Sequence, residues 1–242
     1  MNTLEKYRDA LRKSDKIIVD LSDTAIKGNA AYGAFYIPWE RLKKGKIKDA
    51  LSLFLNGVRL YVTSHTKSPS DGWEKENLVL ADLYKCLDRH RVTKEEMQHG
   101  VEKYLNSRLF RRKGFEDCLK KLKNYGIPKE TILFTKESSE SADAAKNHLG
   151  FDRSISNETT IYPNNTINGV NFKMATPEDR LTVLQKEAGN LEKAVVISNN
   201  LSDKKVLKDR VGLFIPFSNK SRNGENHISS FEEFSRQLDD SD

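Results

Sequence analysis

Three clusters of polar residues in this sequence each follow an apolar run, and their side chains could act together on an anionic ligand. The clusters occupy residues 20–24, 135–138 and 198–203. Asp20 and Asp203 could attack an electrophile or hold a cation, and Thr135 and Lys136 could bind an anion. A single cluster of this kind is more often a turn or a helix cap, because Asp, Ser and Thr are preferred at both places. Its repetition after three apolar runs favours a shared site.

The apolar runs before these clusters have the composition of buried β-strands. Residues 16–19, 131–134 and 194–197 are rich in β-branched side chains, and stretches with helical periodicity separate them. This alternation predicts an α/β fold with a doubly wound, mainly parallel sheet. Ligands of such sheets bind at the carboxyl ends of the strands. We therefore expect the three strands to be adjacent and their polar clusters to meet at one edge.

A long helical insertion separates the first predicted strand from the others. Between residues 25 and 113, apolar residues recur at helical spacing, as at Ile47, Leu51 and Leu55, with a turn-rich stretch at 64–72. We interpret 25–113 as a helical cap domain over the site, and residues 1–24 with 114–242 as the α/β core domain. A helical bundle that serves only stability is the alternative.

The remaining elements are also predicted from periodicity and turn residues. A helix begins at Pro177 with Thr176 as its N-cap, and residues 151–170 are predicted to form strands or a hairpin. Turns are expected at 163–165 and at Asn168-Gly169. The other expected elements are helices at 2–14, 115–124, 142–149 and 231–238 and a strand at 211–217.

Composition and charge favour a cytoplasmic protein with a solvated surface that attracts anionic ligands. The 242 residues contain 41 Lys and Arg and 35 Asp and Glu, a net charge of +6, and the two signs are interspersed. This mixture disfavours nucleic acid as a partner. The apolar runs are too short to span a membrane. The first residues lack the basic and then apolar order of a signal peptide, so we expect none. Cys86 and Cys118 lack metal-ligand or disulfide-framework spacing, and we interpret both as buried apolar residues.

The motifs resemble those of the haloacid dehalogenase-like (HAD) superfamily, and within it the phosphoserine phosphatase-like branch. The residues that carry the resemblance are Asp20-Leu-Ser-Asp-Thr24, the strand ending at Thr135, the segment 149–170, the helix from Pro177, the strand leading to Asp203, and Gly212 to Phe217. The resemblance covers about 150 residues outside the insertion. It implies the α/β core, a helical cap, Mg²⁺, and hydrolysis of a small phosphorylated metabolite or another small anion.

The same resemblance implies roles for individual residues. Asp20 matches the nucleophile that forms an aspartyl-phosphate, and Ser22 stands at the general acid position. Thr135, Lys136 and Arg180 match phosphate-binding positions, with Lys173 and Lys186 as other candidates for the phosphate clamp. The implied metal ligands are Asp20, Asn199 and Asp203.

Four positions depart from the family pattern. Ser22 cannot supply a proton as the family's Asp does, and loss of such a group typically costs about 10²–10⁴-fold in rate. Asn199 replaces an acidic residue, so Mg²⁺ binding is expected to be weak or absent, and Asn199→Asp to tighten it. Glu137 would repel a phosphate, and Asn29 stands where a cap Glu binds the amino group of phosphoserine.

These departures leave three hypotheses open. The chain could be a phosphatase-type enzyme with weak or altered activity, a pseudo-phosphatase that binds a ligand or protein, or a metal-independent dehalogenase-type hydrolase. The last is suggested by Ser198-Asn-Asn-Leu-Ser-Asp203, which resembles the corresponding segment of metal-independent haloacid dehalogenases, with Arg41 or Arg59 as a halide partner. Mg²⁺ at Asp20 and Asp203 would favour the first hypothesis. An Arg180 or Lys173 side chain paired with Asp20 would favour the other two.

Overall fold

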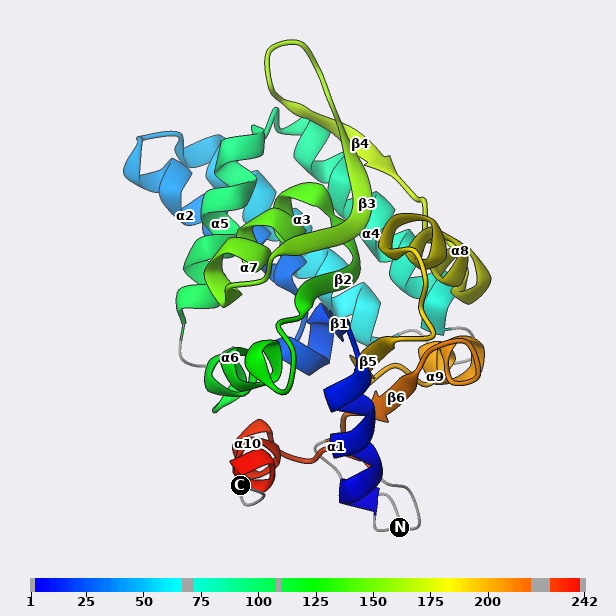
Figure 1. Cartoon of the computed structure of the whole chain (residues 1–242). Coiled ribbons are helices and arrows are strands. Elements are labelled where there is room, and N and C mark those ends of the chain that lie inside the picture. Colours follow the sequence, from blue (N-terminus) through cyan, green and yellow to red (C-terminus); the bar gives the residue numbers. More distant parts are fainter. Residues whose placement is uncertain (1–2, 67–71, 108–109, 219–226, 240–242) are drawn as a thin grey trace.

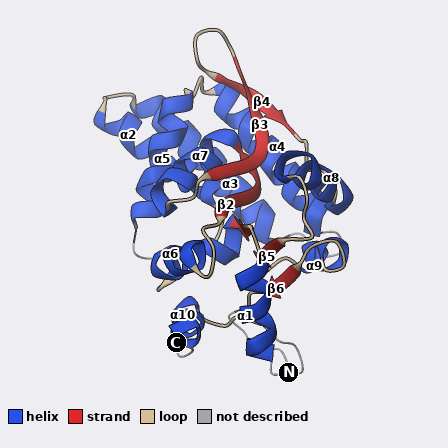
Figure 2. Ribbon diagram, viewed as in Figure 1, coloured by secondary structure: helices blue, strands red, loops and turns tan. Residues whose placement is uncertain are grey.

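A six-stranded sheet forms the centre of the protein (Figures 1 and 2). The computed structural model describes residues 3–66, 72–107, 110–218 and 227–239. Within them the strand order is β4-β3-β2-β1-β5-β6. The strands are β1 (Lys16–Asp20), β2 (Glu130–Ser138), β3 (Arg153–Ile161), β4 (Ile167–Asn171), β5 (Ala194–Ser198) and β6 (Leu213–Pro216). Their pairings are parallel except for β3 with β4. The predicted mainly parallel α/β sheet is confirmed, with β1 between β2 and β5.

Side chains of β1 alternate between two hydrophobic clusters because successive residues of a strand face opposite sides of the sheet. Ile17 and Val19 pack into one cluster, and Ile18 packs into the other. Helices α1 (Thr3–Lys13), α6 (Phe115–Asn124), α7 (Ser139–Leu149) and α10 (Phe231–Asp239) contribute buried residues to the first cluster. Helices α8 (Pro177–Ala188) and α9 (Leu201–Leu207) contribute to the second. The sheet is therefore covered by helices on both faces.

The described residues from 30 to 106 form helices that are joined by short non-helical connections. It contains the 3₁₀ helix η2 (Ala30–Phe35) and the helices α2 (Tyr36–Lys43), α3 (Ile47–Thr66), α4 (Gly72–Arg89) and α5 (Lys94–Asn106). An irregular turn, η1 (Leu21–Ala25), connects it to β1. A Cβ atom on Gly33 would lie 2.5 Å from the backbone of Val101, so η2 and α5 approach closely. These helices lie beside the carboxyl end of β1, as expected for an insertion after the first strand (Figure 1).

The structure differs from the predicted elements at three places. Strand β2 continues through Ser138, past the predicted end at Phe134, because it pairs again with β3 after a register shift. Asn168 and Gly169 lie within β4, where Gly169 pairs with Thr160, and the turn of the hairpin is at 162–166. Residues 64–66 continue α3, and 67–71, part of the predicted turn-rich stretch, lie outside the described residues. None of the described helices has the length and hydrophobicity needed to cross a bilayer.

Candidate functional site

The polar clusters at the ends of β1, β2 and β5 meet beside one cavity. Parallel pairing places Asp20 level with Phe134 of β2, and Ile197 of β5 lies beside Val19. The cavity has a volume of about 570 Å³. It is lined by Glu137 and by six of the site residues implied by the sequence. The six are Asp20, Ser22, Thr135, Lys136, Arg180 and Asn199. Asp203, the seventh, does not line the cavity and contacts Arg180.

A buried arginine lies between the two aspartates of the site. Arg180 Nη2 lies 2.6 Å from Asp20 Oδ1, and Arg180 Nε lies 3.4 Å from Asp203 Oδ1. All three residues are at most 6% exposed. Burial raises the pKa of Asp20 to about 6, although Arg180 acts in the opposite direction. Burial would lower the pKa of Arg180, but the two carboxylates raise it above its ordinary value. The guanidinium is therefore charged and neutralises the carboxylates.

Helix α8 positions this arginine. Thr176 caps the helix by accepting a hydrogen bond from the Asp179 N–H, and Asp179 accepts one from the Thr176 N–H. Pro177 occupies the first helical turn, as predicted. Arg180 follows one turn into the helix, and its guanidinium packs over the Phe134 ring at 4.1 Å. A cation near a helix N-terminus is unfavourable with respect to the helix dipole, so the two carboxylates are needed to hold it there.

Hydroxyl groups connect the ends of β1 and β5. Thr24 Oγ1 donates a long hydrogen bond of 3.4 Å to Asp20 Oδ2 and accepts one of 2.9 Å from the Asn199 N–H. Ser198 Oγ donates to Asp203 Oδ2 at 2.8 Å. Each aspartate thus has one oxygen near Arg180 and the other near a hydroxyl. This arrangement fixes the orientation of both carboxylates.

Ser22 is paired with a carboxyl group that the sequence interpretation treated only as a repulsive charge. Its Oγ donates to Glu137 Oε1 at 2.7 Å, and the Ala30 N–H donates to the same oxygen at 2.8 Å. Glu137 is 2% exposed, and burial raises its pKa to about 7. About half of these side chains are therefore neutral near pH 7. The expected repulsion of a phosphate by Glu137 is reduced accordingly, and a proton donor lies next to Ser22.

Thr135 and Lys136 lie on the extension of β2 beside the cavity. Thr135 Oγ1 accepts a hydrogen bond from the Glu137 N–H at 3.2 Å. Burial, together with the nearby Arg180, lowers the pKa of Lys136 to about 8. At neutral pH most Lys136 side chains therefore still carry a positive charge. With Arg180, they give this end of the cavity two cations that could attract an anion.

Several other candidates from the sequence lie elsewhere. Lys173 Nζ forms an ion pair of 2.5 Å with Glu158, and Lys186 is exposed on α8 and does not line the cavity. Arg41 binds Asp49 and Glu96 within the helical segment, and Arg59 is exposed. Among the three candidates for the phosphate clamp, Arg180 is the one beside Asp20. Asn29 lines the cavity and caps η2 by accepting a hydrogen bond from the Ala31 N–H.

The donor groups of the site do not fit Mg²⁺. This ion prefers oxygen ligands in octahedral geometry and is attracted by carboxylates. Here Arg180 contacts one oxygen of Asp20 and one of Asp203. Among the described residues, no group of three or more Asp, Glu, His or Cys side chains could hold a metal ion. The guanidinium provides the positive charge between the carboxylates that a metal would otherwise provide.

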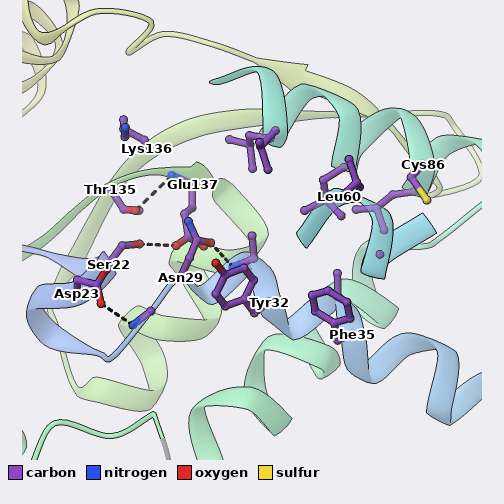
Figure 3. Close-up of a pocket in the computed structure, with 18 of the residues that line it drawn as sticks. Ser22, Asp23, Asn29, Tyr32, Phe35, Leu60, Cys86, Thr135, Lys136 and Glu137 are labelled. Carbon is purple, nitrogen blue, oxygen red and sulfur yellow. Dashed lines mark hydrogen bonds between the residues drawn. The ribbon is translucent and has the colours of Figure 1, made fainter. Parts of the chain in front are cut away.

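Most of the remaining lining of the cavity is apolar and comes from the helical segment. Figure 3 shows Ser22, Thr135, Lys136 and Glu137 on one side, with Phe35, Leu60 and Cys86 across from them. Further apolar lining residues come from η2, α2, α3 and α4. They are Ala31, Ala34, Pro38, Leu53, Val79, Leu80, Leu83 and Leu87. The sequence predicted a cap over the site but did not predict this apolar surface.

Comparisons with known proteins find similarity in structure but not in sequence. No family model matches the chain, and a search of curated proteins finds no match. A substrate-bound phosphoserine phosphatase is similar to it with a TM-score of 0.55 and 16% identity, over 93% of this chain and 98% of the other. A phosphoserine phosphohydrolase-like protein from Francisella tularensis has a TM-score of 0.56 and 16% identity, over 92% and 98%. A protein of unknown function from Bordetella pertussis has a TM-score of 0.61 and 15% identity, over 89% and 98%.

Proposed function

We propose that this chain, which has the HAD-like fold of the phosphoserine phosphatases, is a pseudo-phosphatase that binds a small phosphorylated molecule. The bound molecule lies in the cavity with its phosphate near Arg180 and Lys136. The helical insertion at 25–113 acts as the cap domain that encloses it. The bound molecule is not hydrolysed, and its binding does not require Mg²⁺. Fold alone does not determine function, so the proposal depends on the site.

The observation that carries this proposal is the bridge from Arg180 to both aspartates. In the resembled enzymes the matching Asp is the nucleophile, and its charge is offset by Mg²⁺. Here Arg180 holds Asp20 at 2.6 Å, which makes the carboxylate a weaker nucleophile. Lys136, which also lines the cavity, supplies the further positive charge that an anion needs. Ser22 also lacks the acidity to protonate a leaving group. This arrangement allows a phosphate to bind but does not support fast phosphoryl transfer.

Calorimetry with phosphomonoesters in EDTA tests the proposal. We expect binding that 10 mM Mg²⁺ leaves unchanged, and about a tenfold or greater loss of affinity in Lys136→Gln. Lys186→Gln is the matched control, because Lys186 is exposed and outside the cavity. Hydrolysis above about 1 s⁻¹, an ordinary enzymatic rate, that disappears in Asp20→Asn would overturn the assignment as a pseudo-phosphatase.

A slow, metal-independent phosphatase is a second candidate, and the pairing of Ser22 with Glu137 favours it. A carboxylate oxygen of Asp20 would attack phosphorus while the phosphorus–oxygen ester bond breaks and Glu137 gives its proton to the leaving oxygen. Water would then attack the aspartyl-phosphate, lose its proton to Glu137, and release phosphate and Asp20. Mass spectrometry after incubation with a phosphomonoester in EDTA would detect phosphate on Asp20. The unmodified protein is the result expected of a pseudo-phosphatase.

A metal-independent dehalogenase-type reaction is tested in the same series. Asn199 and Asn200 line the cavity next to Asp20, which supports keeping this alternative. Short haloacids would release halide if Asp20 attacked carbon and the carbon–halogen bond broke. Halide release that is lost in Asp20→Asn would replace the phosphate-binding proposal.

A further inference from the structure

The wall of the cavity that faces the polar site consists mainly of apolar side chains. We use "cap-side wall" for its lining residues between 30 and 106, which include Phe35, Leu53, Leu60, Leu80, Leu83 and Leu87. None of the described residues in this wall is charged. Figure 3 shows Phe35 and Leu60 pointing into the cavity from different helices. A bound molecule that extends away from Asp20 therefore meets hydrocarbon.

This wall is incompatible with a charged substituent on the ligand. An ammonium or carboxylate group that reached the cap-side wall would lie against leucine and phenylalanine side chains, where unpaired charges are strongly unfavourable. Asn29 also lines the cavity, and its Oδ1 already accepts a hydrogen bond from the Ala31 N–H at 2.8 Å. The cavity volume of about 570 Å³ is within the range of small-molecule sites and exceeds what a phosphate alone would occupy.

We propose that the ligand is an anionic amphiphile, a phosphomonoester whose alcohol portion is an uncharged aliphatic chain or ring. This inference rests on the proposed function, because the phosphate is placed at Arg180 and Lys136. The uncharged portion fills the space between α3 and α4 and contacts Leu60 and Leu83. Each buried methylene contributes about 0.8 kcal/mol, so affinity rises about fourfold per carbon until the cavity is filled.

A series of alkyl phosphates measures this dependence directly. The ligands are inorganic phosphate and methyl, butyl and octyl phosphate, titrated by calorimetry in EDTA, with octanol as the uncharged control. From methyl to butyl phosphate, three methylenes predict an increase in affinity of about 60-fold. The heat capacity change of binding becomes more negative with chain length, because apolar surface is buried.

Variants on opposite faces of α3 separate cavity contacts from general effects on the cap. Leu60→Asn places a polar group in the cap-side wall, and we expect about a tenfold loss of affinity for octyl phosphate with methyl phosphate unchanged. Leu55→Asn is the matched control, because Leu55 is exposed on the same helix and does not line the cavity. Leu83→Phe keeps the wall apolar and reduces its volume, so the chain length of highest affinity becomes shorter. This second variant remains informative if Leu60→Asn fails to fold.

The outcomes distinguish the two proposals. Binding of inorganic and methyl phosphate without dependence on chain length would overturn the amphiphile and leave the phosphate site intact. Octanol binding as tightly as octyl phosphate would overturn the phosphate site, and the amphiphile with it. No binding of any phosphate would likewise overturn both. Both proposals are supported if affinity rises with chain length, if this rise requires the phosphate, and if Leu60→Asn reduces it while Leu55→Asn does not.

Discussion

Arg180 and Asp20 are 160 positions apart in the sequence and meet with Nη2 2.6 Å from Oδ1. Arg180 also contacts Asp203, so one cation compensates two carboxylates in an almost fully buried cluster. Burying an unpaired charge is much more costly than burying a paired one. This cluster therefore determines both what the site can bind and how the end of the sheet is stabilised.

Removing the arginine should destabilise the protein strongly. Arg180→Met leaves Asp20 and Asp203 buried without their cation, and we expect a loss of about 3–5 kcal/mol in the free energy of unfolding. Lys173→Met is the matched control, because its ion pair with Glu158 is partly exposed and should contribute at most about 1 kcal/mol. Chemical denaturation at pH 7.5 measures both.

A compensated variant tests the cause. Asp20→Asn and Asp203→Asn, added to Arg180→Met, remove all three charges and should recover much of the lost stability. A triple variant no more stable than Arg180→Met would show that the charges are not the reason for the loss.

Glu137 should make stability decrease as pH rises. Its pKa is about 7 in the folded protein and about 4.5 when exposed, so between these values the native state holds a proton that the unfolded state has lost. The contribution of this group to the free energy of unfolding is therefore largest below pH 4.5, and it decreases as the pH rises to about 7. Glu137→Gln removes the effect and should be more stable than the wild type at pH 8, by on the order of 2 kcal/mol.

Comparison at two pH values provides the control for this variant. At pH 4 the wild-type carboxyl is neutral, so Glu137→Gln and the wild type should differ little. Asp20, whose pKa is also raised by burial, titrates in both proteins, and its charge contributes to the raised pKa of Glu137. A Glu137→Gln variant that is less stable than the wild type at pH 8 would contradict a buried, unfavourable charge at this position.

The sequence predicted the site as far as local patterns reach. The three strands, their common edge and the capped helix that carries Arg180 were predicted from β-branched runs and from the Thr176-Pro177 signal. These patterns depend on neighbouring residues, which is why they are visible in a sequence. The adjacency of the three strands, which the structure shows, was expected from the rules for parallel α/β folds.

The pairing of Ser22 with Glu137 could not be predicted in the same way. These residues are 115 positions apart, and the contact requires β2 to continue beyond Phe134 after a register shift against β3. A strand prediction that ends at residue 134 places Glu137 in a loop, where its charge would be solvated. The apolar wall was missed for a similar reason, because helical periodicity does not tell which face of α3 or α4 points toward the site.

Ser22→Asp should increase any residual turnover of an alkyl phosphate more than that of an aryl phosphate. An alkoxide is a poor leaving group without a proton, whereas an aryl oxide leaves readily, and general acid catalysis typically contributes about 10²–10⁴-fold. The new carboxyl would lie near Glu137, whose Oε1 is 2.7 Å from Ser22 Oγ, so the two groups would share a proton. Phosphate release from both substrates measures the effect. Equal increases for both substrates would mean that protonation does not limit the reaction.

A metal site should require two changes. Asn199→Asp alone adds a carboxylate, but Arg180 still contacts Asp20 and Asp203, so we now expect little gain in Mg²⁺ binding from this variant. Asn199→Asp with Arg180→Ala removes the competing cation and leaves three acidic side chains whose mutual repulsion Mg²⁺ would relieve. A ligand that binds only the folded state stabilises it by about 2.7 kcal/mol at 100 times its Kd. We therefore expect 10 mM Mg²⁺ to raise the Tm of the double variant by several degrees and to leave that of the wild type unchanged.

Arg180→Ala alone is the matched control for the double variant. Tight Mg²⁺ binding by Asn199→Asp alone, measured by calorimetry, would show that the arginine yields to a metal and would restore the magnesium-dependent interpretation.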